Sequence, residues 1–194
     1  MNYYVVETDK HKLIQKTAGV KARQDVETIF KWNNFKKIEI PCLIEGRENK
    51  TRLGKIKAHY DVYMLWKNAL KKIKKNDWIY IQFPLLEHTM LFSLLIKNLE
   101  KRGIHTSIII HDVEAIRFTL RNDVPLSRKI RMRFEEISSF KNCSKIIVHN
   151  EKMKSFMHEK WKIHKDKMDI LGIFDYLVEN YNEELLEKRN LSRK

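Results

Sequence analysis

The chain has 194 residues and a mass of 23.5 kDa, and 43% of its residues are hydrophobic and 33% charged. This is the composition of a globular protein with one good-sized core, and only 5 glycines and 3 prolines exclude collagen-like and low-complexity classes. Lys and Arg number 39 against 25 Asp and Glu, so the formal charge is +14, which indicates an anionic partner: nucleic acid, an anionic membrane surface or a phosphorylated substrate.

Short β-like runs alternate with longer amphipathic runs in the first half of the chain. The predicted strands are residues 3–7, 37–43 and 77–83, of which the second contains Pro41 and therefore suits a sheet edge or a strand end. The predicted helices are residues 20–30, 56–73 and 87–102, each with apolar residues at helical spacing. Gly103 follows the third helix as its expected C′ residue.

The same alternation continues in the second half. Three consecutive isoleucines in residues 105–110 predict a strand that is covered on both faces, as in a parallel sheet. A basic helix is expected from Pro125 to about Asn142, with Ser127 as its N-cap. The remaining expected elements are a strand at 145–149, a helix at 151–161 capped by Asn150, and a last strand at 168–173.

Six alternations of strand and helix predict a doubly wound α/β fold with a mostly parallel sheet of about six strands. Residues 1–177 form this Rossmann-like domain, and residues 178–194 form a polar helical tail or a linker. In such sheets the ligand crevice lies at the carboxyl ends of the strands. Candidate functional residues are therefore sought in the loops that follow each strand.

The loop after the fourth strand carries the richest group of candidates. His111 offers a titratable base near neutral pH, and Asp112 beside it is either a second catalytic candidate or the cap of a short helix. Neighbouring residues of a strand point in opposite directions, so one of the two is expected to face the crevice. Arg117 is placed to contact a phosphate.

The other strand ends supply weaker candidates. Thr17 and Gly19 precede the first helix, where backbone N–H groups can approach a phosphate, although the pattern equally fits a simple helix start. Gln82 ends the third strand and either binds a sugar hydroxyl or merely terminates the strand. His149 lines the crevice or stands as a satisfied polar residue beside the capping Asn150.

Metal and disulfide chemistry find no support in the sequence. The histidines show no ligand spacing, and neither a nucleophile-elbow motif nor a catalytic Cys–His pattern is present. Cys42 and Cys143 are far apart and are expected to be reduced, partly buried thiols.

Three basic stretches, residues 71–75, 128–133 and 160–165, are interrupted by apolar or aromatic residues. This pattern suits contact with an anionic membrane surface, although most charge runs are simply solvated helix faces. The Arg-rich helix that contains residues 128–133 interleaves Ile130, Met132 and Phe134 with its cations, so it is the best membrane candidate. No run approaches the about 20 apolar residues that span a bilayer, and residues 1–6 lack signal-peptide features, so we expect a cytoplasmic protein.

Five short motifs together resemble one family. They are residues 18–22 with Asp25, residues 82–84, residues 109–112 with Arg117, residues 148–150 with Met153, and residues 171–177. In this order and spacing they resemble the N-terminal domain of GT-B glycosyltransferases, and within these the bacterial glucosyltransferase 3 and β-1,6-galactofuranosyltransferase-like family. The resemblance extends over about residues 3–177, and Thr17 departs from the expected Asn or Ser.

The resemblance implies a hexosyltransferase that moves a sugar from a nucleotide-sugar, a UDP-sugar, to a cell-surface polysaccharide or glycan acceptor. Gly19 and Lys21 would lie near the donor phosphates, with Thr17, Arg117, His149 and Asn150 also contacting substrate. Gln82, His111 and Asp112 would line the acceptor side, one of the last two being the base. No metal and no cofactor besides the donor are implied.

The resemblance also sets the expected partners. A second Rossmann-like domain, in cis or in trans, would bind most of the nucleotide, so this chain alone is expected to be inactive. The basic helices would hold the enzyme peripherally at the inner face of the plasma membrane, near a glycan or lipid-linked acceptor. Two alternatives remain open: a basic nucleic-acid-binding α/β module, which lacks any recognisable signature, and a non-catalytic partner subunit of a split transferase.

Overall fold

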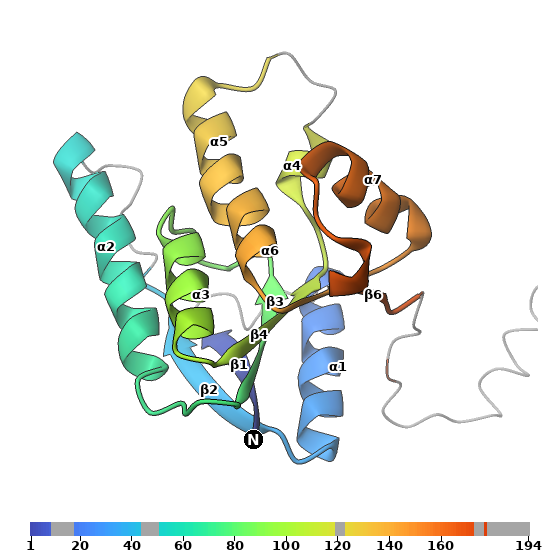
Figure 1. Ribbon diagram of the computed structural model, residues 1–194. Coiled ribbons are helices and arrows are strands. Elements are labelled where there is room, and N and C mark those ends of the chain that lie inside the picture. Colours follow the sequence, from blue (N-terminus) through green and yellow to red (C-terminus); the bar gives the residue numbers. More distant parts are fainter. Residues whose placement is uncertain (9–17, 44–50, 119–122, 173–176, 178–194) are drawn as a thin grey trace, which may run out of the picture.

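The computed structural model describes residues 1–8, 18–43, 51–118, 123–172 and 177. Its six strands form one parallel sheet in the order β2-β1-β3-β4-β5-β6 (Figure 1). The strands are β1 (Asn2–Thr8), β2 (Lys36–Pro41), β3 (Trp78–Phe83), β4 (His105–Ile110), β5 (Lys145–Val148) and β6 (Met168–Ile170). The doubly wound, parallel α/β fold expected from the sequence is confirmed.

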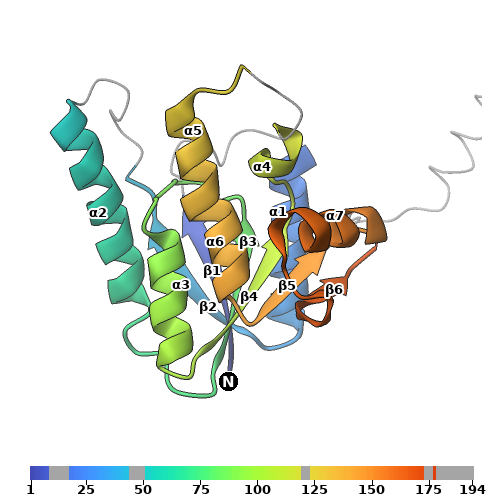
Figure 2. The same cartoon turned by 45° about the horizontal axis from the view of Figure 1, so that its top comes forward.

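Helices connect successive strands. Among the described residues they are α1 (Ala18–Trp32), α2 (Arg52–Ala69), α3 (Phe92–Lys101), α4 (Glu114–Arg117), α5 (Leu126–Arg131), α6 (Ser138–Asn142) and α7 (Glu151–Trp161). A π-helical segment, η2 (Met132–Ile137), joins α5 to α6, and a short 3-10 turn, η3 (Lys165–Lys167), precedes β6. The segment from α5 to α6 is therefore one helical rod with a π-helical middle (Figure 2).

The two faces of the sheet are covered unequally. Helix α1 packs on one face, where Phe30 joins Tyr4, Val6 and Ile109 in a small apolar cluster. Helices α2, α3 and α6 cover the other face and bury a much larger cluster (Figures 1 and 2). Because α1 and α2 leave the sheet on opposite faces, the winding reverses between β1 and β3.

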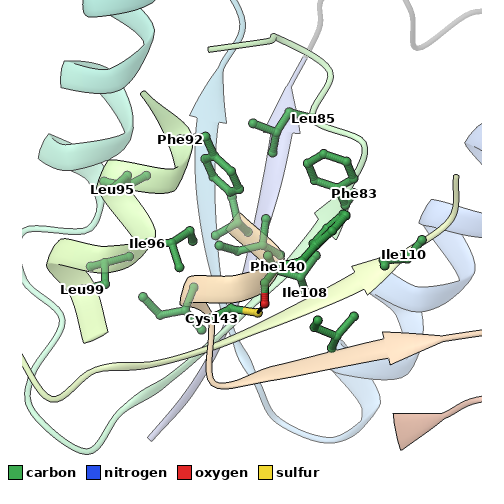
Figure 3. Packing of buried hydrophobic residues seen from close by; sticks show 14 of the residues in the cluster. Phe83, Leu85, Phe92, Leu95, Ile96, Leu99, Ile108, Ile110, Phe140 and Cys143 are labelled. Atoms are coloured by element: carbon green, nitrogen blue, oxygen red, sulfur yellow. Dashed lines mark hydrogen bonds between the residues drawn. The ribbon is translucent and has the colours of Figure 1, made fainter. Parts of the chain in front are cut away.

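The larger core is built from strand residues of alternate register and from one face of each covering helix. Phe83 of β3 meets Phe140 of α6 edge to face, with ring centroids 5.1 Å apart (Figure 3). Helix α3 contributes four fully buried side chains at helical spacing, Phe92, Leu95, Ile96 and Leu99. Cys143 lies in this core as a free thiol, as expected, but it is fully and not partly buried, and burial raises the pKa of its thiol to about 12.

Several expected boundaries are wrong. Helix α2 ends at Ala69 and not at residue 73, because Leu70 and Ile73 are buried from the turn that follows. Helix α3 begins at Phe92 and not at residue 87, because residues 84–91 form a loop. The last strand stops at Ile170, three residues early.

Two expected caps are also wrong, and one is confirmed. Pro125 is the N-cap of α5, and Ser127 lies inside the helix. Val113 is the N-cap of α4, although Asp112 Oδ1 accepts a 2.8 Å hydrogen bond from the Val113 N–H. Asn150 caps α7 as expected, since its Oδ1 accepts a 2.9 Å hydrogen bond from the Met153 N–H.

Candidate functional site

A cavity of about 360 Å³ lies at the point where the winding reverses, against the carboxyl ends of β1 and β3 and helix α1. Its volume is at the small end of the range of about 300–1,000 Å³ that is typical of ligand pockets. Its charged and amide side chains come from four elements: Glu7 of β1, Arg23, Gln24 and Glu27 of α1, Lys37 and Glu39 of β2, and Gln82 of β3. Parallel sheets bind ligands at this kind of position. We call this cavity, together with the loops that follow β3 and β4 beside it, the crevice.

Gln82 joins the strand ends to α1. Its buried amide donates from Nε2 to the backbone carbonyl of Arg23 at 3.4 Å. Its Oε1 is therefore the acceptor in the 2.7 Å hydrogen bond with His111 Nε2. This arrangement puts the imidazole proton of His111 on Nε2 and leaves a lone pair on Nδ1.

His111 is a neutral imidazole in this environment. Burial lowers its pKa to about 4, and the positive charges at Arg23 and His149 add to the effect. A neutral ring with a lone pair on Nδ1 accepts a hydrogen bond from a hydroxyl, but a pKa near 4 makes it a weak proton acceptor. The geometry therefore suits His111 to orienting a hydroxyl group.

Arg23 brings a positive charge to the same cavity. Its Nη2 donates to the carbonyl oxygen of Pro84, in the loop that follows β3. Burial lowers the pKa of its guanidinium, which the negative charge of Glu7 partly offsets. The side chain still remains charged at neutral pH, because arginine does not lose its proton in proteins.

Glu7 holds the loop after β3 in place. Its two oxygens accept hydrogen bonds from the backbone N–H groups of Leu86, at 2.8 Å, and Glu87, at 3.2 Å. Burial raises the pKa of Glu7 to about 7, against the opposing effect of these two bonds. The Glu87 carboxylate in turn accepts a 2.6 Å hydrogen bond from the Leu43 N–H after β2, so two carboxylates connect the ends of three neighbouring strands.

Asp112 points toward other partners than His111 does. Its Oδ2 pairs with the Arg117 guanidinium, and its Oδ1 accepts from the Val113 N–H. Asp112 and Arg117 thus form a local pair on the rim. Strand β4 ends at Ile110, so the two residues lie in the loop and the alternation expected along a strand does not apply to them.

His149 and Asn150 follow β5 at the same edge of the sheet. His149 Nε2 lies 3.3 Å from the backbone carbonyl oxygen of His111, so it is in contact with the His111 loop. Asn150 is occupied in capping α7. The structure therefore brings Gln82, His111 and His149 together and leaves Asn150 to a structural role.

The candidates on α1 are more dispersed. Lys21 forms a 2.6 Å ion pair with the buried carboxylate of Asp25, whose other oxygen accepts from the Leu177 N–H at 3.1 Å. Gly19 is exposed near the start of α1, and a Cβ added to it would meet nothing within 4 Å. Thr17 lies outside the described residues.

A group of buried carboxylates next to the crevice was not expected from the sequence. Glu135 and Glu136, adjacent in η2, are 0% and 1% exposed. Glu135 Oε1 lies 2.5 Å from His88 Nδ1, and Glu136 Oε2 accepts a 2.8 Å hydrogen bond from the Ala115 N–H of α4. Glu135 therefore attaches the helical rod to the loop after β3, and Glu136 attaches it to α4.

The charges of this group are largely compensated. Glu114 pairs with Arg128 at 3.0 Å and also with Arg131. Burial by itself raises the pKa of Glu114, but the two arginines outweigh it and hold the pKa below its usual value. For Glu136, burial and two neighbouring carboxylates raise the pKa to about 7. Among the described residues no cluster of His, Cys, Asp or Glu could hold a metal ion.

Glu7 and Arg23 were missed by the sequence reasoning, although a signal for Glu7 was available. Glu7 stands at the end of the expected first strand, and the strand-end rule that selected Gln82 and His111 also selects it. Arg23 lies within the expected first helix, and the sequence predicts that a charged residue at such a position faces solvent. Only the fold shows that this turn of α1 faces the crevice.

Comparison with known proteins connects this crevice to a family. No curated protein gives a significant match to the chain. The family model described as glucosyltransferase 3-like, N-terminal domain, matches residues 2–173, a range that contains all six strands and the crevice. The chain therefore belongs to the glucosyltransferase 3-like family, of which it represents the N-terminal domain.

Proposed function

We propose that this domain is the acceptor-binding half of a hexosyltransferase, with the crevice of Glu7, Arg23, Gln82 and His111 holding the acceptor sugar. The observation that supports the proposal most directly is the chain of hydrogen bonds from Arg23 through Gln82 to His111 at the point of winding reversal. His111 does not line the cavity itself but adjoins it through Gln82, and this bond leaves the lone pair of the ring on Nδ1. A sugar hydroxyl is the donor that fits such a group.

The charge balance of the crevice supports a neutral acceptor over an anionic one. Arg117 is paired with Asp112, and Arg131 with Glu114. The negative charges of Glu7 and Glu27 act on Arg23, and Lys37 on the cavity wall is paired with Glu39. An anion-binding site needs cations that carboxylates do not already neutralise, so a sugar ring suits this crevice better than a phosphate does.

The donor nucleotide then belongs to the second Rossmann-like domain, in cis or in trans, and transfer takes place between the two domains. The acceptor hydroxyl must lose its proton as it attacks the sugar, and a carboxylate or imidazole at a strand end meets that need. Because the pKa of His111 is about 4, this residue is better suited to orienting the hydroxyl, and Asp112, which is paired with Arg117, is the proton acceptor to test. Neither a metal nor a further cofactor is part of the proposal.

Sugar titration of this chain, followed by NMR, tests the acceptor role. Methyl glucoside, methyl galactoside and UDP are added separately, and the imidazole signals of His111 and the amide signals of Gln82 are recorded. We expect at least one glycoside to move these signals, and UDP to leave them unchanged. Movement of the same signals by UDP, with none caused by the glycosides, would assign the crevice to the donor and overturn the proposal.

Kinetics of the complete two-domain enzyme test the catalytic role. His111→Ala and Asp112→Asn should lower turnover while UDP affinity stays the same. His164→Ala, at a solvent-exposed histidine far from the strand ends, is the matched control and should behave as wild type. Unchanged turnover in both crevice variants would remove the crevice from the chemistry.

A further inference from the structure

The first part of the helical rod, α5 and η2, carries a line of apolar side chains on its solvent side. Leu126, Ile130 and Phe134 are spaced four residues apart, so they lie on one helical face, and they are between 39% and 72% exposed. Single exposed apolar residues are ordinary. Three in line on one helix form a continuous stripe, which indicates a partner.

The acidic residues of this rod are all turned inward. Residues 126–137 contain only Glu135 and Glu136 as acids, and both are buried. Lys129 and Arg133, beside the stripe, are exposed. The outward face of the rod therefore presents apolar side chains flanked by cations and no carboxylate.

Helix α2 repeats this arrangement. Leu53, Ile56 and Tyr60 follow helical spacing and are between 54% and 78% exposed. Lys55 and Lys57 stand exposed beside them, and Lys57 lies 3.7 Å from Asp61. Helix α2 thus carries a second apolar and basic stripe in its first half.

Both stripes lie at the same end of the molecule. Helices that connect parallel strands run against the strand direction, so the N-terminal halves of α2 and α5 stand at the carboxyl edge of the sheet, beside the crevice (Figures 1 and 2). The view in Figure 2 shows α3 between them, with the starts of α2 and α5 extending past it. We name the two stripes together the edge patch.

We propose that the edge patch docks on an anionic lipid surface. Apolar side chains flanked by lysine and arginine on helix ends match the chemistry of a bilayer interface, where the former enter the headgroup region and the latter meet lipid phosphates. The excess of 14 positive charges over the chain favours the same partner. Docking through this edge would hold the crevice close to the membrane plane.

Vesicle flotation of the full chain tests this docking. The probes are vesicles of phosphatidylcholine with phosphatidylserine and vesicles of phosphatidylcholine alone. We expect binding to the former, weakening as salt is added, and little binding to the latter. The triple variant Leu126→Ser, Ile130→Ser, Phe134→Ser should weaken binding by at least about tenfold, whereas Ile29→Ser with Trp32→Ser, two exposed apolar residues of α1 on the other face, should not.

Charge variants provide an independent arm. Each cation at an anionic surface contributes about fivefold, so Lys129→Gln with Arg133→Gln should weaken binding by about 25-fold. Lys71→Gln with Lys72→Gln, which removes the same charge after the far end of α2, should have a much smaller effect. His111→Ala should leave vesicle binding unchanged, which separates this proposal from the function of the crevice.

Four results would overturn the docking proposal. Equal binding to both vesicle types, or equal loss in the edge-patch and control variants, would show that net charge or general stickiness is responsible. A dimer in light scattering that the triple serine variant abolishes would assign the patch to a second copy of the chain. Retention by an RNA or DNA oligonucleotide, with no flotation, would assign it to nucleic acid.

Discussion

The amide of Gln82 determines which nitrogen of His111 carries the proton. Because Gln82 Nε2 donates to the Arg23 carbonyl, Oε1 must face His111 Nε2, 2.7 Å away, and accept a hydrogen bond from its N–H. A single buried amide thereby links α1, β3 and the end of β4. The imidazole is neutral and has a defined direction before any ligand arrives.

Nitrogen NMR of His111 checks this relationship. We expect signals of a ring protonated at Nε2 and bare at Nδ1, with a titration midpoint near the pKa of about 4 that burial produces. Gln82→Leu removes the acceptor, so the variant should show a mixture of the two neutral ring forms. A wild-type midpoint in the neutral range, or an unchanged ring form in Gln82→Leu, would contradict the assignment.

The pH dependence of stability should report on Glu136. Its pKa is about 7 in the folded chain and 4.5 without the fold, so between these values the folded state binds more protons and stability falls as pH rises. Glu136→Gln keeps an oxygen for the Ala115 N–H but has no proton to lose. Relative to wild type, the variant should therefore gain up to about 3 kcal/mol between pH 5 and pH 8.

Urea unfolding at those two pH values measures the difference between variant and wild type. Contributions from His111 and Glu7 are present in both proteins and cancel in that difference. A difference that does not change with pH would show that Glu136 ionises normally in the fold.

Two glycines should respond to alanine in opposite ways. Gly103 has a φ of +72°, and a Cβ there would lie 2.8 Å from Lys75 Cγ, so Gly103→Ala should cost roughly 1–2 kcal/mol. Gly19 lies in α1 with open space around it, so Gly19→Ala should stabilise the protein by up to about 1 kcal/mol. Thermal unfolding of the pair decides the matter, and similar effects of the two substitutions would refute it.

The cap of α7 should contribute measurable stability. Asn150→Ala removes the acceptor for the Met153 N–H and should cost about 1 kcal/mol, whereas Asn150→Ser keeps an oxygen at the N-cap and should cost much less. Chemical unfolding compares the two variants. Equal losses would mean that Asn150 acts through something other than its cap.

The order of the strands along the chain was predictable because strands of a parallel sheet have a strong local sequence pattern. The strand at 105–110 is predicted with correct ends because three consecutive isoleucines fit a strand covered on both sides, and β4 is buried from Thr106 to Ile110. Asn150 was assigned correctly since an Asn before a helix has a well-defined local role. Gln82, His111 and His149 converge because parallel strands end on one side.

What the sequence did not reveal depends on contacts between distant segments. Two adjacent glutamates in a basic helix are expected to face solvent, yet Glu135 and Glu136 are buried. Glu135 is held by His88, 47 residues away, and Glu136 by the N–H of Ala115, 21 residues away. The π-helical segment that carries them has no signature in an apolar pattern. For the same reason Met132, expected at the membrane-facing surface, is buried, and Leu126 is exposed there instead.

Hydrogen bonds hold the loops around the crevice in place. Glu7 binds the loop after β3, and Glu87 of that loop binds the segment after β2. A ligand would bind to loops that are already ordered, so little conformational entropy of the protein would be lost on binding. Selectivity would then arise from shape and from the directions of fixed dipoles. If the crevice binds the acceptor as proposed, such a rim of ordered loops would discriminate among closely related sugars by the directions of their hydroxyl groups.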